Sequence, residues 1–236
     1  MKGVGFLKQV LTLLIVKVFP VKWKEYKELS YWKKVKKAEG TMSNAHYEYF
    51  YTFHFGFQKT FFDNKTLLDL GCGPRGSLEW ADNAERRIGL DPLAMDYLKL
   101  GADKQNMEYL ASSSECIPLI DGACDAIFSF NSLDHVEHIP KTVQEIKRCL
   151  APDGIFLLLV EVNHPSTACE PHSLSPKMLV DLFFPEFKAE NIQVFKPEKA
   201  GMYDSIKHGK TVDDPLKYLD IGYFSAKFVR NNGLSL

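Results

Sequence analysis

The 236-residue chain is poor in cysteine, carries almost no net charge, and lacks internal repeats and any long unbroken apolar run. Its five cysteines include no C-x-x-C pair, which argues against a disulfide framework or a zinc site and favours reduced thiols in a cytoplasmic protein. The apolar run 10–19 is interrupted by Lys17 and is shorter than the about 20 residues that span a bilayer. We therefore expect neither a membrane-spanning nor a disulfide-stapled protein.

The formal net charge of −1 conceals an uneven distribution. Residues 1–37 contain ten lysines and two glutamates, whereas residues 38–236 contain 19 basic and 28 acidic side chains. Two interpretations of the basic segment stay open. It forms either a helix packed on the domain or on a partner, or a peripheral helix on an anionic membrane, where each lysine contributes about 1 kcal/mol. The acidic remainder disfavours a nucleic-acid partner.

Short apolar runs alternate with longer amphipathic stretches from residue 66 onward. This alternation is typical of an α/β fold, in which helices cover both faces of a mostly parallel sheet. Strands are expected at residues 66–70, 86–91, 107–111, 124–130, 154–162, 191–195 and 223–229. Helices are expected between them at 77–83, 94–101, 142–150 and 176–184. The segment 196–221 shows no clear helix, so one of the last two strands is expected to run antiparallel.

The composition of the chain changes near residue 65. Residues 1–65 are rich in lysine and aromatic side chains, and we expect them to form a helical cap that covers the carboxyl edge of the sheet and walls off a substrate cleft. Aromatic packing without a ligand role is the alternative. Residues 66–236 are expected to form the ligand-binding domain, a Rossmann-like, doubly wound, seven-stranded mixed sheet.

The first expected strand runs directly into a glycine-rich loop in LLDLGCGPRG, residues 67–76. A strand followed by G-x-G-x-x-G is typical of nucleotide binding at the carboxyl end of that strand. In dinucleotide enzymes the loop faces an anionic pyrophosphate, which the carboxylate of Asp69 would repel. Asp69 therefore favours a cationic ligand without phosphate, such as S-adenosylmethionine. Asp91 ends the second expected strand, where an acidic side chain accepts hydrogen bonds from both ribose hydroxyls.

Four motifs in consecutive order resemble those of a known family, the class I S-adenosylmethionine-dependent methyltransferases of the type 11 branch. The motifs are LLDLGCGPRG, IGLD, YLASSSECIPLIDGACDAIFSFNSLDHV and IKRCLAPDGIFLLLVEVN, which lie between residues 67 and 163. The resemblance implies a methyltransferase whose cofactor is S-adenosylmethionine. By position it implies a cofactor site made of Asp69, Gly71, Cys72, Gly73, Asp91, Ser113, Ser114, Glu115 and Asn131.

The same resemblance implies which part of the cofactor each residue meets. The loop backbone at Gly71 and Cys72 would meet the methionine part, as would Asn131, and residues 113–115 would border the adenine. Ser113 departs from the family, which commonly has an aspartate that accepts from the adenine amino group. A hydroxyl accepts that bond more weakly than a carboxylate. We therefore expect either a lower cofactor affinity or that Glu115 takes this role.

Two histidine-containing segments follow the fourth and fifth expected strands. NSLDHVEH contributes His135, and EVNHPSTACEPHSLSP contributes His164 and His172. An oxygen acceptor needs a base to remove its proton, so these three histidines are the catalytic candidates, with a structural role as the alternative for His135. His164, Glu170 and His172 are of types that bind metals, but their spacing matches no standard metal-binding motif. No metal is expected.

The sequence thus predicts an S-adenosylmethionine-dependent methyltransferase that acts on a small or medium-sized molecule, at a hydroxyl group of a sugar, lipid or secondary metabolite. Two alternatives stay open. One is an NAD(P)-linked oxidoreductase on the same sheet topology, and the other is a non-catalytic protein that binds the cofactor and serves as a partner or adaptor. No pattern in the chain indicates its oligomeric state.

Overall fold

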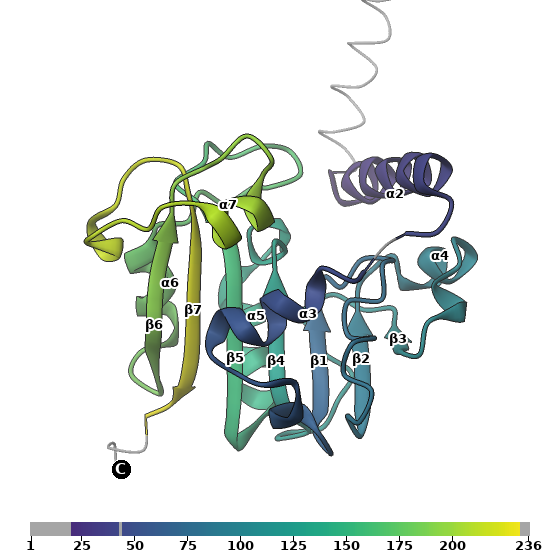
Figure 1. Ribbon diagram of the computed structural model, residues 1–236, viewed down its shortest axis with the longest axis horizontal. Helices are drawn as coiled ribbons and strands as arrows, with labels where there is room; N and C mark the ends of the chain where they lie inside the picture. The colour runs from purple at the N-terminus through teal and green to yellow at the C-terminus, as the bar shows by residue number, and fades with distance from the viewer. Residues whose placement is uncertain (1–19, 43, 232–236) are drawn as a thin grey trace, which may run out of the picture.

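A mixed sheet forms the centre of the computed structural model, which describes residues 20–42 and 44–231 (Figure 1). Within these residues the sheet has seven strands in the order β3-β2-β1-β4-β5-β7-β6, and β7 runs antiparallel to both of its neighbours. The strands are β1 Thr66–Leu70, β2 Arg86–Leu90, β3 Glu108–Leu110, β4 Cys124–Phe130, β5 Leu150–Val162, β6 Phe187–Phe195 and β7 Gly222–Arg230. The predicted α/β fold and the predicted antiparallel strand are confirmed.

The central strands are apolar on both faces because both faces are covered. Every residue of β1 is buried. In β4, Ala126 and Phe128 contribute to one hydrophobic core, whereas Ile127 between them contributes to the other. The sheet therefore separates two apolar layers.

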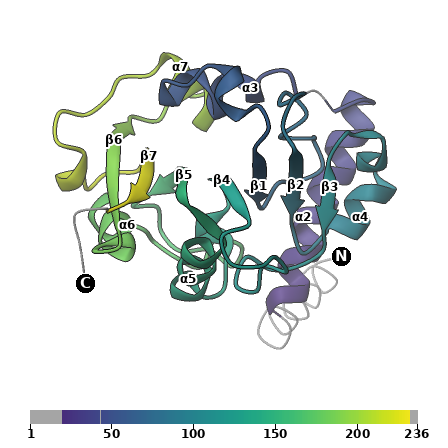
Figure 2. The same ribbon diagram turned by 90° about the horizontal axis from the view of Figure 1, so that it is seen from below.

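One face of the sheet is covered by α5 (Ile139–Cys149) and α6 (Pro176–Phe183), as the view in Figure 2 shows. α5 buries apolar residues at intervals of three to four, which places them on one side of the helix. Ser175 caps α6, because its hydroxyl accepts a hydrogen bond from the Met178 amide at 3.2 Å. Both helices agree with the sequence prediction, although α5 begins three residues earlier than expected.

The opposite face is covered mainly by the segment before β1 (Figure 2), and aromatic side chains of this segment fill the core on that face. This segment contains α3 Tyr47–Tyr51, η1 Phe53–Phe55 and η2 Lys59–Phe62. The rings of Tyr51 and Phe62 lie 4.9 and 5.9 Å from that of Phe128 on β4, measured between centroids. The aromatic segment is therefore a layer of the core, which is the alternative that the composition left open.

The aromatic face also carries α7 (Met202–His208), in a segment that was predicted to lack a helix. That prediction was wrong. Met202 and Ile206 lie one helical turn apart and are buried against the aromatic layer. The Ser205 hydroxyl accepts a hydrogen bond from the Glu198 amide at 2.8 Å. Tertiary packing stabilises this helix, which is too short to be stable by itself.

The helix predicted at residues 77–83 is absent, and turns join β1 to β2. The Ser77 hydroxyl donates to Asp69, and the Leu78 amide faces the Met107 sulfur at 3.3 Å. The backbone hydrogen bonds that form here span two or three residues, as in turns. Asp and Asn near the end of so short a segment also favour turns. As a result, no helix begins at the glycine-rich loop.

Helix α2 (Pro20–Glu39) lies over the carboxyl ends of β1 and β2 (Figure 1). This is where the sequence predicted a helical cap, while the domain boundary at residue 65 stays a prediction. The apolar run 10–19 lies outside the described residues. No helix in the described part of the chain is long and apolar enough to cross a membrane. The remaining short helical elements are α4 Ala94–Lys99, η3 Ala102–Lys104, η4 Leu133–His135 and η5 Pro215–Lys217.

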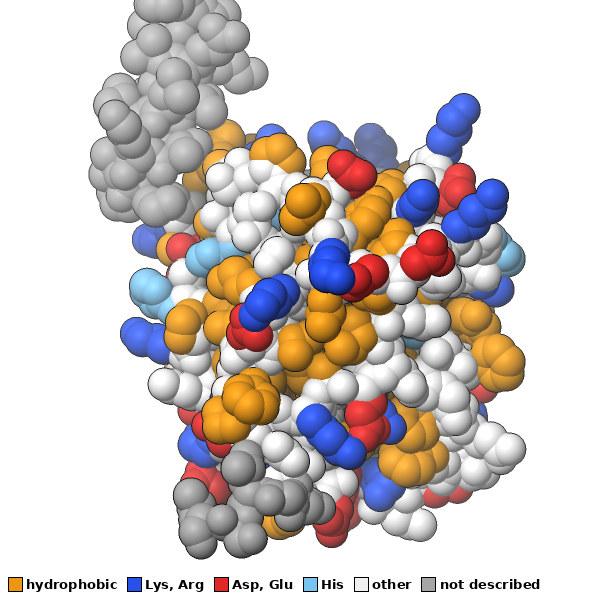
Figure 3. Space-filling view, turned by 90° about the vertical axis from the view of Figure 1, so that its left-hand side faces the viewer, with side chains coloured by type: hydrophobic (Ala, Val, Ile, Leu, Met, Phe, Trp, Pro, Cys, Tyr) orange, Lys and Arg blue, Asp and Glu red, His pale blue; other side chains and the backbone are white. Residues whose placement is uncertain are grey.

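Strand β6 forms one edge of the sheet, on the side of the molecule seen in Figure 3. Glu190 on this strand pairs with Lys188 at 2.7 Å and with Lys227 of β7 at 2.8 Å. Exposed hydrophobic side chains lie between charged ones on this face. Charges on an edge strand oppose pairing with the edge of another sheet.

We predict that Phe62→Ala lowers the free energy of unfolding by about 3–5 kcal/mol, because a buried ring is lost from the aromatic layer. Urea titration followed by circular dichroism measures this. Phe53→Ala is the matched control, since Phe53 belongs to the same segment but is 71% exposed. It should change the free energy of unfolding by less than about 0.5 kcal/mol. Equal losses in the two variants would show that the aromatic layer does not stabilise the fold.

Candidate functional site

Asp69, near the end of β1, is buried at the carboxyl edge of the sheet. Tyr51 donates its hydroxyl to Asp69 Oδ2 at 2.9 Å, and the hydroxyl of Ser77 donates to the same oxygen. Among the described residues, no hydrogen bond reaches Oδ1 and no ion pair involves this carboxylate. Asp69 is therefore a buried carboxylate that the protein holds by one oxygen and does not neutralise.

Burial shifts the titration of both acidic residues at this edge. It raises the pKa of Asp69 to about 7, although hydrogen bonds from Ser77 and Tyr51 oppose the shift. Burial also raises the pKa of Asp91 to about 6, opposed by backbone amides. The charge of Asp91 further raises the pKa of Asp69, so the two carboxylates act on one another. A positively charged ligand would favour the ionised form of both carboxyl groups and so offset part of the free energy that their burial and mutual repulsion cost.

The glycine-rich loop has a backbone shape that side chains would disturb. Gly71, Gly73 and Gly76 have φ values of 69°, 59° and 73°, in the left-handed region. A Cβ atom at Gly71 would lie only 2.4 Å from Ser132 Cβ. The first glycine thus permits the close approach of the loop after β1 to the loop after β4.

The amides of this loop point into the protein. The Gly71 N–H donates to the Leu90 carbonyl at 2.8 Å, and the Cys72 N–H reaches the same oxygen at 3.4 Å. The Gly73 N–H donates to Asp91 Oδ2 at 3.4 Å. A diphosphate site uses free loop amides and a helix N-terminus, and residues 71–83, all of them described, offer neither free amides at 71–73 nor a helix. This geometry argues against a dinucleotide ligand.

Asp91 follows β2, and each of its two oxygens accepts a hydrogen bond from a backbone amide, one of them in the glycine-rich loop. Oδ1 accepts from the Leu93 amide at 2.8 Å, and Oδ2 accepts from Gly73. Cys72 turns its sulfur towards Gly89, where an added Cβ atom would lie 2.6 Å from that sulfur. Only the backbone of Cys72 can therefore serve a ligand at this loop.

The segment 113–115 is folded back on itself. The Ser113 hydroxyl donates to Glu115 Oε2 at 3.2 Å, and Glu115 Oε1 accepts from the amides of Glu137 and His138, both at 2.7 Å. Ser114 is half-buried beside them. Glu115 therefore joins this loop to the start of α5, and its engagement with two amides leaves it less available to an adenine than the sequence suggested.

Asn131 directly follows β4, has a φ of 55° and is exposed. The backbone N–H of Asn131 donates to the Leu159 carbonyl at 2.7 Å. The next residue, Ser132, donates its hydroxyl to the Leu70 carbonyl at 2.7 Å and lies 2.7 Å from the Ser129 hydroxyl. These bonds join the ends of β1 and β4, so Asn131 is held close to the glycine-rich loop.

Helix α2 is anchored to the site by polar contacts at both of its ends. Near its C-terminus, Glu39 binds two nitrogens of Arg75 at 2.8 and 2.7 Å, and the Arg75 guanidinium lies 5.5 Å from the ring of Trp32. Near its N-terminus, Lys24 donates to the backbone carbonyl of His135. The helix therefore bridges the loop after β1 and the loop after β4.

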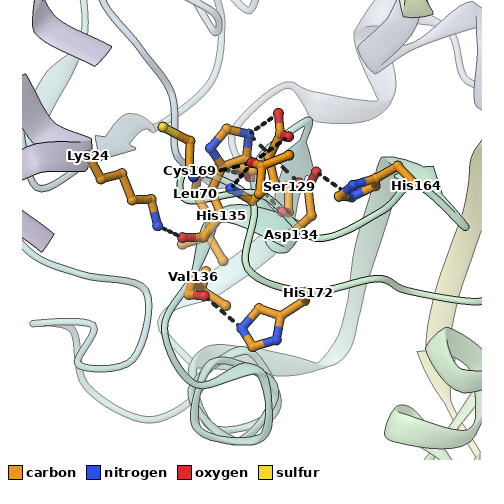
Figure 4. Close-up of polar contacts among 12 residues, drawn as sticks. Lys24, Leu70, Ser129, Asp134, His135, Val136, His164, Cys169 and His172 are labelled. Atoms are coloured by element: carbon orange, nitrogen blue, oxygen red, sulfur yellow. Dashed lines mark hydrogen bonds and ion pairs between the residues drawn. The ribbon is translucent and has the colours of Figure 1, made fainter. Parts of the chain in front are cut away.

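Asp134 lies between two of the predicted catalytic histidines, beyond the ends of β4 and β5 (Figure 4). His164 Nε2 lies 3.5 Å from Asp134 Oδ2, and His135 Nε2 lies 4.0 Å from Oδ1. His135 Nε2 is also 3.8 Å from Glu170 Oε1. Burial raises the pKa of Asp134, and the two histidines oppose this shift.

His172 does not join this cluster. Its Nε2 lies 2.9 Å from the Val136 carbonyl, a bond in which the ring donates, and Figure 4 shows the ring directed away from Asp134. The structure thus brings His135 and His164 together and separates His172 from them.

Three residues at the site escaped the sequence analysis. Ser77 directly follows the glycine-rich loop, so its contact with Asp69 could have been suspected from its position. Tyr51 lies 18 residues before Asp69, and Trp32 lies earlier still. Both come from residues 1–65, which were expected to wall off a substrate cleft, but no local pattern marks either residue as part of the site.

The sheet order and the acidic site agree with the methyltransferase class that the sequence predicts. Comparison with known families supports the same class. Residues 68–158 match the family model described as "Methyltransferase domain". This part of the chain is therefore similar to a methyltransferase domain, in agreement with the resemblance that the sequence motifs indicate.

Curated relatives match less than half of the chain. An uncharacterized protein of Methanocaldococcus jannaschii is 32% identical over 104 residues, which are 44% of this chain and 39% of that protein. A malonyl-[acyl-carrier protein] O-methyltransferase of Serratia marcescens is 33% identical over 93 residues, 39% of this chain and 36% of that protein. The matched stretches span well under half the length of these relatives.

Solved structures share the fold at low sequence identity. A methyltransferase of Mesorhizobium loti has a TM-score of 0.55 at 15% identity, covering 72% of this chain and 92% of that one. A methyltransferase of Thermotoga maritima has a TM-score of 0.54 at 16% identity, covering 83% and 95%. The likeness concerns the fold.

We predict that Asp69→Asn stabilises the protein, and more so at pH 8 than at pH 5. The folded protein raises the pKa of this carboxyl to about 7, so ionisation costs no stability below the unfolded pKa of about 3.9, an increasing amount between the two pKa values, and its full amount above pH 7. The gain in the free energy of unfolding should reach about 1–3 kcal/mol at pH 8. Thermal unfolding at the two pH values measures it. A gain of equal size at both would mean that Asp69 is not a strained carboxylate.

Proposed function

We propose that this protein is an S-adenosylmethionine-dependent methyltransferase that methylates a hydroxyl group of a small or medium-sized molecule. The strongest support is Asp69, a buried carboxylate with no cationic partner among the described residues, next to a glycine-rich loop whose amides at residues 71–73 already form hydrogen bonds within the protein. A ligand with an ammonium and a sulfonium suits this edge, and a diphosphate does not.

The residues at this edge fit the cofactor in a consistent order. The loop backbone at Gly71–Gly73 and the carboxylate of Asp69 are proposed to receive the methionine part, together with Asn131. Asp91 is proposed to accept the ribose hydroxyls, because each of its oxygens holds one amide and keeps a further lone pair.

The adenine is proposed to lie against residues 113–115. Ser113 and Ser114 keep hydroxyl groups there, while Glu115 holds the loop in place through its bonds to two amides. In this arrangement Glu115 shapes the adenine site and does not itself accept from the adenine amino group.

Methyl transfer to a hydroxyl moves one proton and one methyl group. The acceptor oxygen loses its proton and attacks the methyl carbon, and the electrons of the C–S bond pass to sulfur, which gives a methyl ether, S-adenosylhomocysteine and a proton. The cluster of Asp134, His135 and His164 lies at the ends of β4 and β5, where the acceptor would meet the methyl group. We propose that this cluster, and not His172, activates the hydroxyl.

The named relatives do not decide the acceptor. One is called a sterol 4-C-methyltransferase, in Caenorhabditis elegans, and another a malonyl-[acyl-carrier protein] O-methyltransferase. The choice of a hydroxyl therefore rests on the histidines and carboxylates of the cluster.

We predict that Asp91→Ala weakens binding of S-adenosylhomocysteine ten- to a hundred-fold, because two ribose hydrogen bonds are lost. Isothermal titration calorimetry measures this, with NADH as a second titrant that should not bind. Asp96→Ala on α4 is the matched control, since the Asp96 side chain is 41% exposed and its one ion pair among the described residues is with Lys99 at 3.1 Å. Unchanged affinity in Asp91→Ala, or tight binding of NADH, would contradict the proposal.

The acceptor class has its own test. Transfer of tritiated methyl groups from S-adenosylmethionine should label hydroxyl compounds among panels of sugars, phenols and lipids, and His135→Ala should reduce the rate by about 10²–10⁴-fold. Labelling confined to amines or carbon acids would overturn the hydroxyl assignment while leaving the cofactor assignment intact.

A further inference from the structure

Three buried polar atoms without hydrogen bonds meet in one place. Among the described residues, six buried side-chain nitrogens or oxygens have no hydrogen-bond partner, and three of these are Asp134 Oδ1, His135 Nε2 and His164 Nε2. The side chains of Asp134 and His164 are 2% and 6% exposed. A buried polar group without a partner costs about 1–3 kcal/mol, so three in one cluster indicate a missing partner.

The direction of the rings shows what kind of partner is missing. His164 Nδ1 lies 3.0 Å from the Pro165 carbonyl, which can only accept, so the ring donates there. In the neutral imidazole, Nε2 then carries a bare lone pair, and it faces Asp134 Oδ2 at 3.5 Å. His135 Nε2 likewise faces oxygens of Asp134 and Glu170 without a hydrogen bond. Histidine nitrogens and carboxylate oxygens therefore face one another here without a hydrogen between them, an arrangement that favours a bound cation.

We propose that Asp134, His135 and Glu170 bind a divalent transition-metal ion. One ligand atom from each of these residues lies within 4.8 Å of the other two. The separations of 3.8 and 4.0 Å exceed hydrogen-bond length, but they lie within about 0.6 Å of the about 3.4 Å between two ligands in a tetrahedral shell with bonds of about 2.1 Å. The site revises our expectation that the protein holds no metal.

Glu170 is prepared for this role by its own loop. Its Oε2 accepts from the Thr167 hydroxyl at 3.1 Å, and its amide donates to the same hydroxyl at 3.0 Å. The other oxygen of Glu170, Oε1, faces His135 Nε2. His164 faces the other oxygen of Asp134 and so orients that carboxylate from the side away from His135.

The ligand types select the metal. An imidazole with two carboxylates suits Zn²⁺, Mn²⁺ or Fe²⁺, whereas Mg²⁺ and Ca²⁺ prefer oxygen ligands alone. Three protein ligands leave coordination positions open.

The place of this metal in the fold suggests its use, an inference that rests on the proposed function. The cluster follows β4 and β5 at the acceptor side of the cofactor edge. A hydroxyl oxygen bound in an open position would lose its proton more readily, because the metal stabilises the oxyanion. The proton passes to solvent, and the oxygen lone pair forms the bond to the methyl carbon. The substrate class is then an alcohol or phenol with a second oxygen near the hydroxyl, which can hold the metal from two sides.

Metal binding can be tested without any methyl-transfer assay. The full chain, prepared without a histidine tag and stripped with EDTA, is titrated with Zn²⁺ by calorimetry and with Mn²⁺ by the loss of the free-ion electron paramagnetic resonance signal. One ion per chain should bind, and Mg²⁺ should not displace it. Glu170→Gln and His135→Gln should each weaken binding at least ten-fold.

The chain offers matched controls beside the ligands. Glu137→Gln and His138→Gln change the same residue types in the same region, but both side chains are exposed and lie outside the cluster. They should leave metal affinity unchanged. Circular dichroism confirms that all four variants are folded.

Two results would overturn the metal site. One is the absence of binding at 100-fold molar excess of Zn²⁺ and Mn²⁺. The other is binding that the control variants weaken as much as the ligand variants do. Neither result affects cofactor binding, which calorimetry with S-adenosylhomocysteine reports separately.

Discussion

A buried, unneutralised carboxylate at the end of β1 is the constraint on which this site depends. Asp69 is held by the hydroxyls of Tyr51 and Ser77 at one oxygen, and burial raises its pKa to about 7. Ionisation of this buried carboxylate destabilises the fold, and the two apolar layers on either face of the sheet offset that loss of stability. Such strained groups concentrate at functional sites, and this one matches the cationic end of S-adenosylmethionine.

The same aspartate explains how neighbouring elements are arranged. The Ser77 hydroxyl turns back to Asp69 where the chain after the glycine-rich loop forms turns instead of a helix, and the amides of Gly71, Cys72 and Gly73 bond within the protein. The face of the sheet that a helix would cover is filled by the aromatic segment before β1, which also delivers Tyr51. Packing and ligand chemistry are therefore combined in one segment.

Much of this could be predicted from the sequence, because local patterns carry it. The strands, α5, α6 and the positions of Asp69 and Asp91 follow from apolar runs and from the spacing of the glycine loop. The turns at 77–83 and the helix α7 could not be predicted, because distant contacts such as Leu78 with Met107 and Met202 with the aromatic layer decide them. The convergence of Asp134 and Glu170 was hidden for the same reason, since they lie on separate loops.

The pH dependence of cofactor affinity tests the central claim most directly. Calorimetry with S-adenosylhomocysteine, whose ammonium group is the cation in question, can be carried out between pH 8.5 and pH 5.5. Affinity should fall by up to about ten-fold per pH unit below about pH 7, because Asp69 must lose a proton before it can pair with the ligand. The Asp69→Asn variant should bind weakly without this fall. Strong binding that is independent of pH, and unchanged by the substitution, would contradict the account.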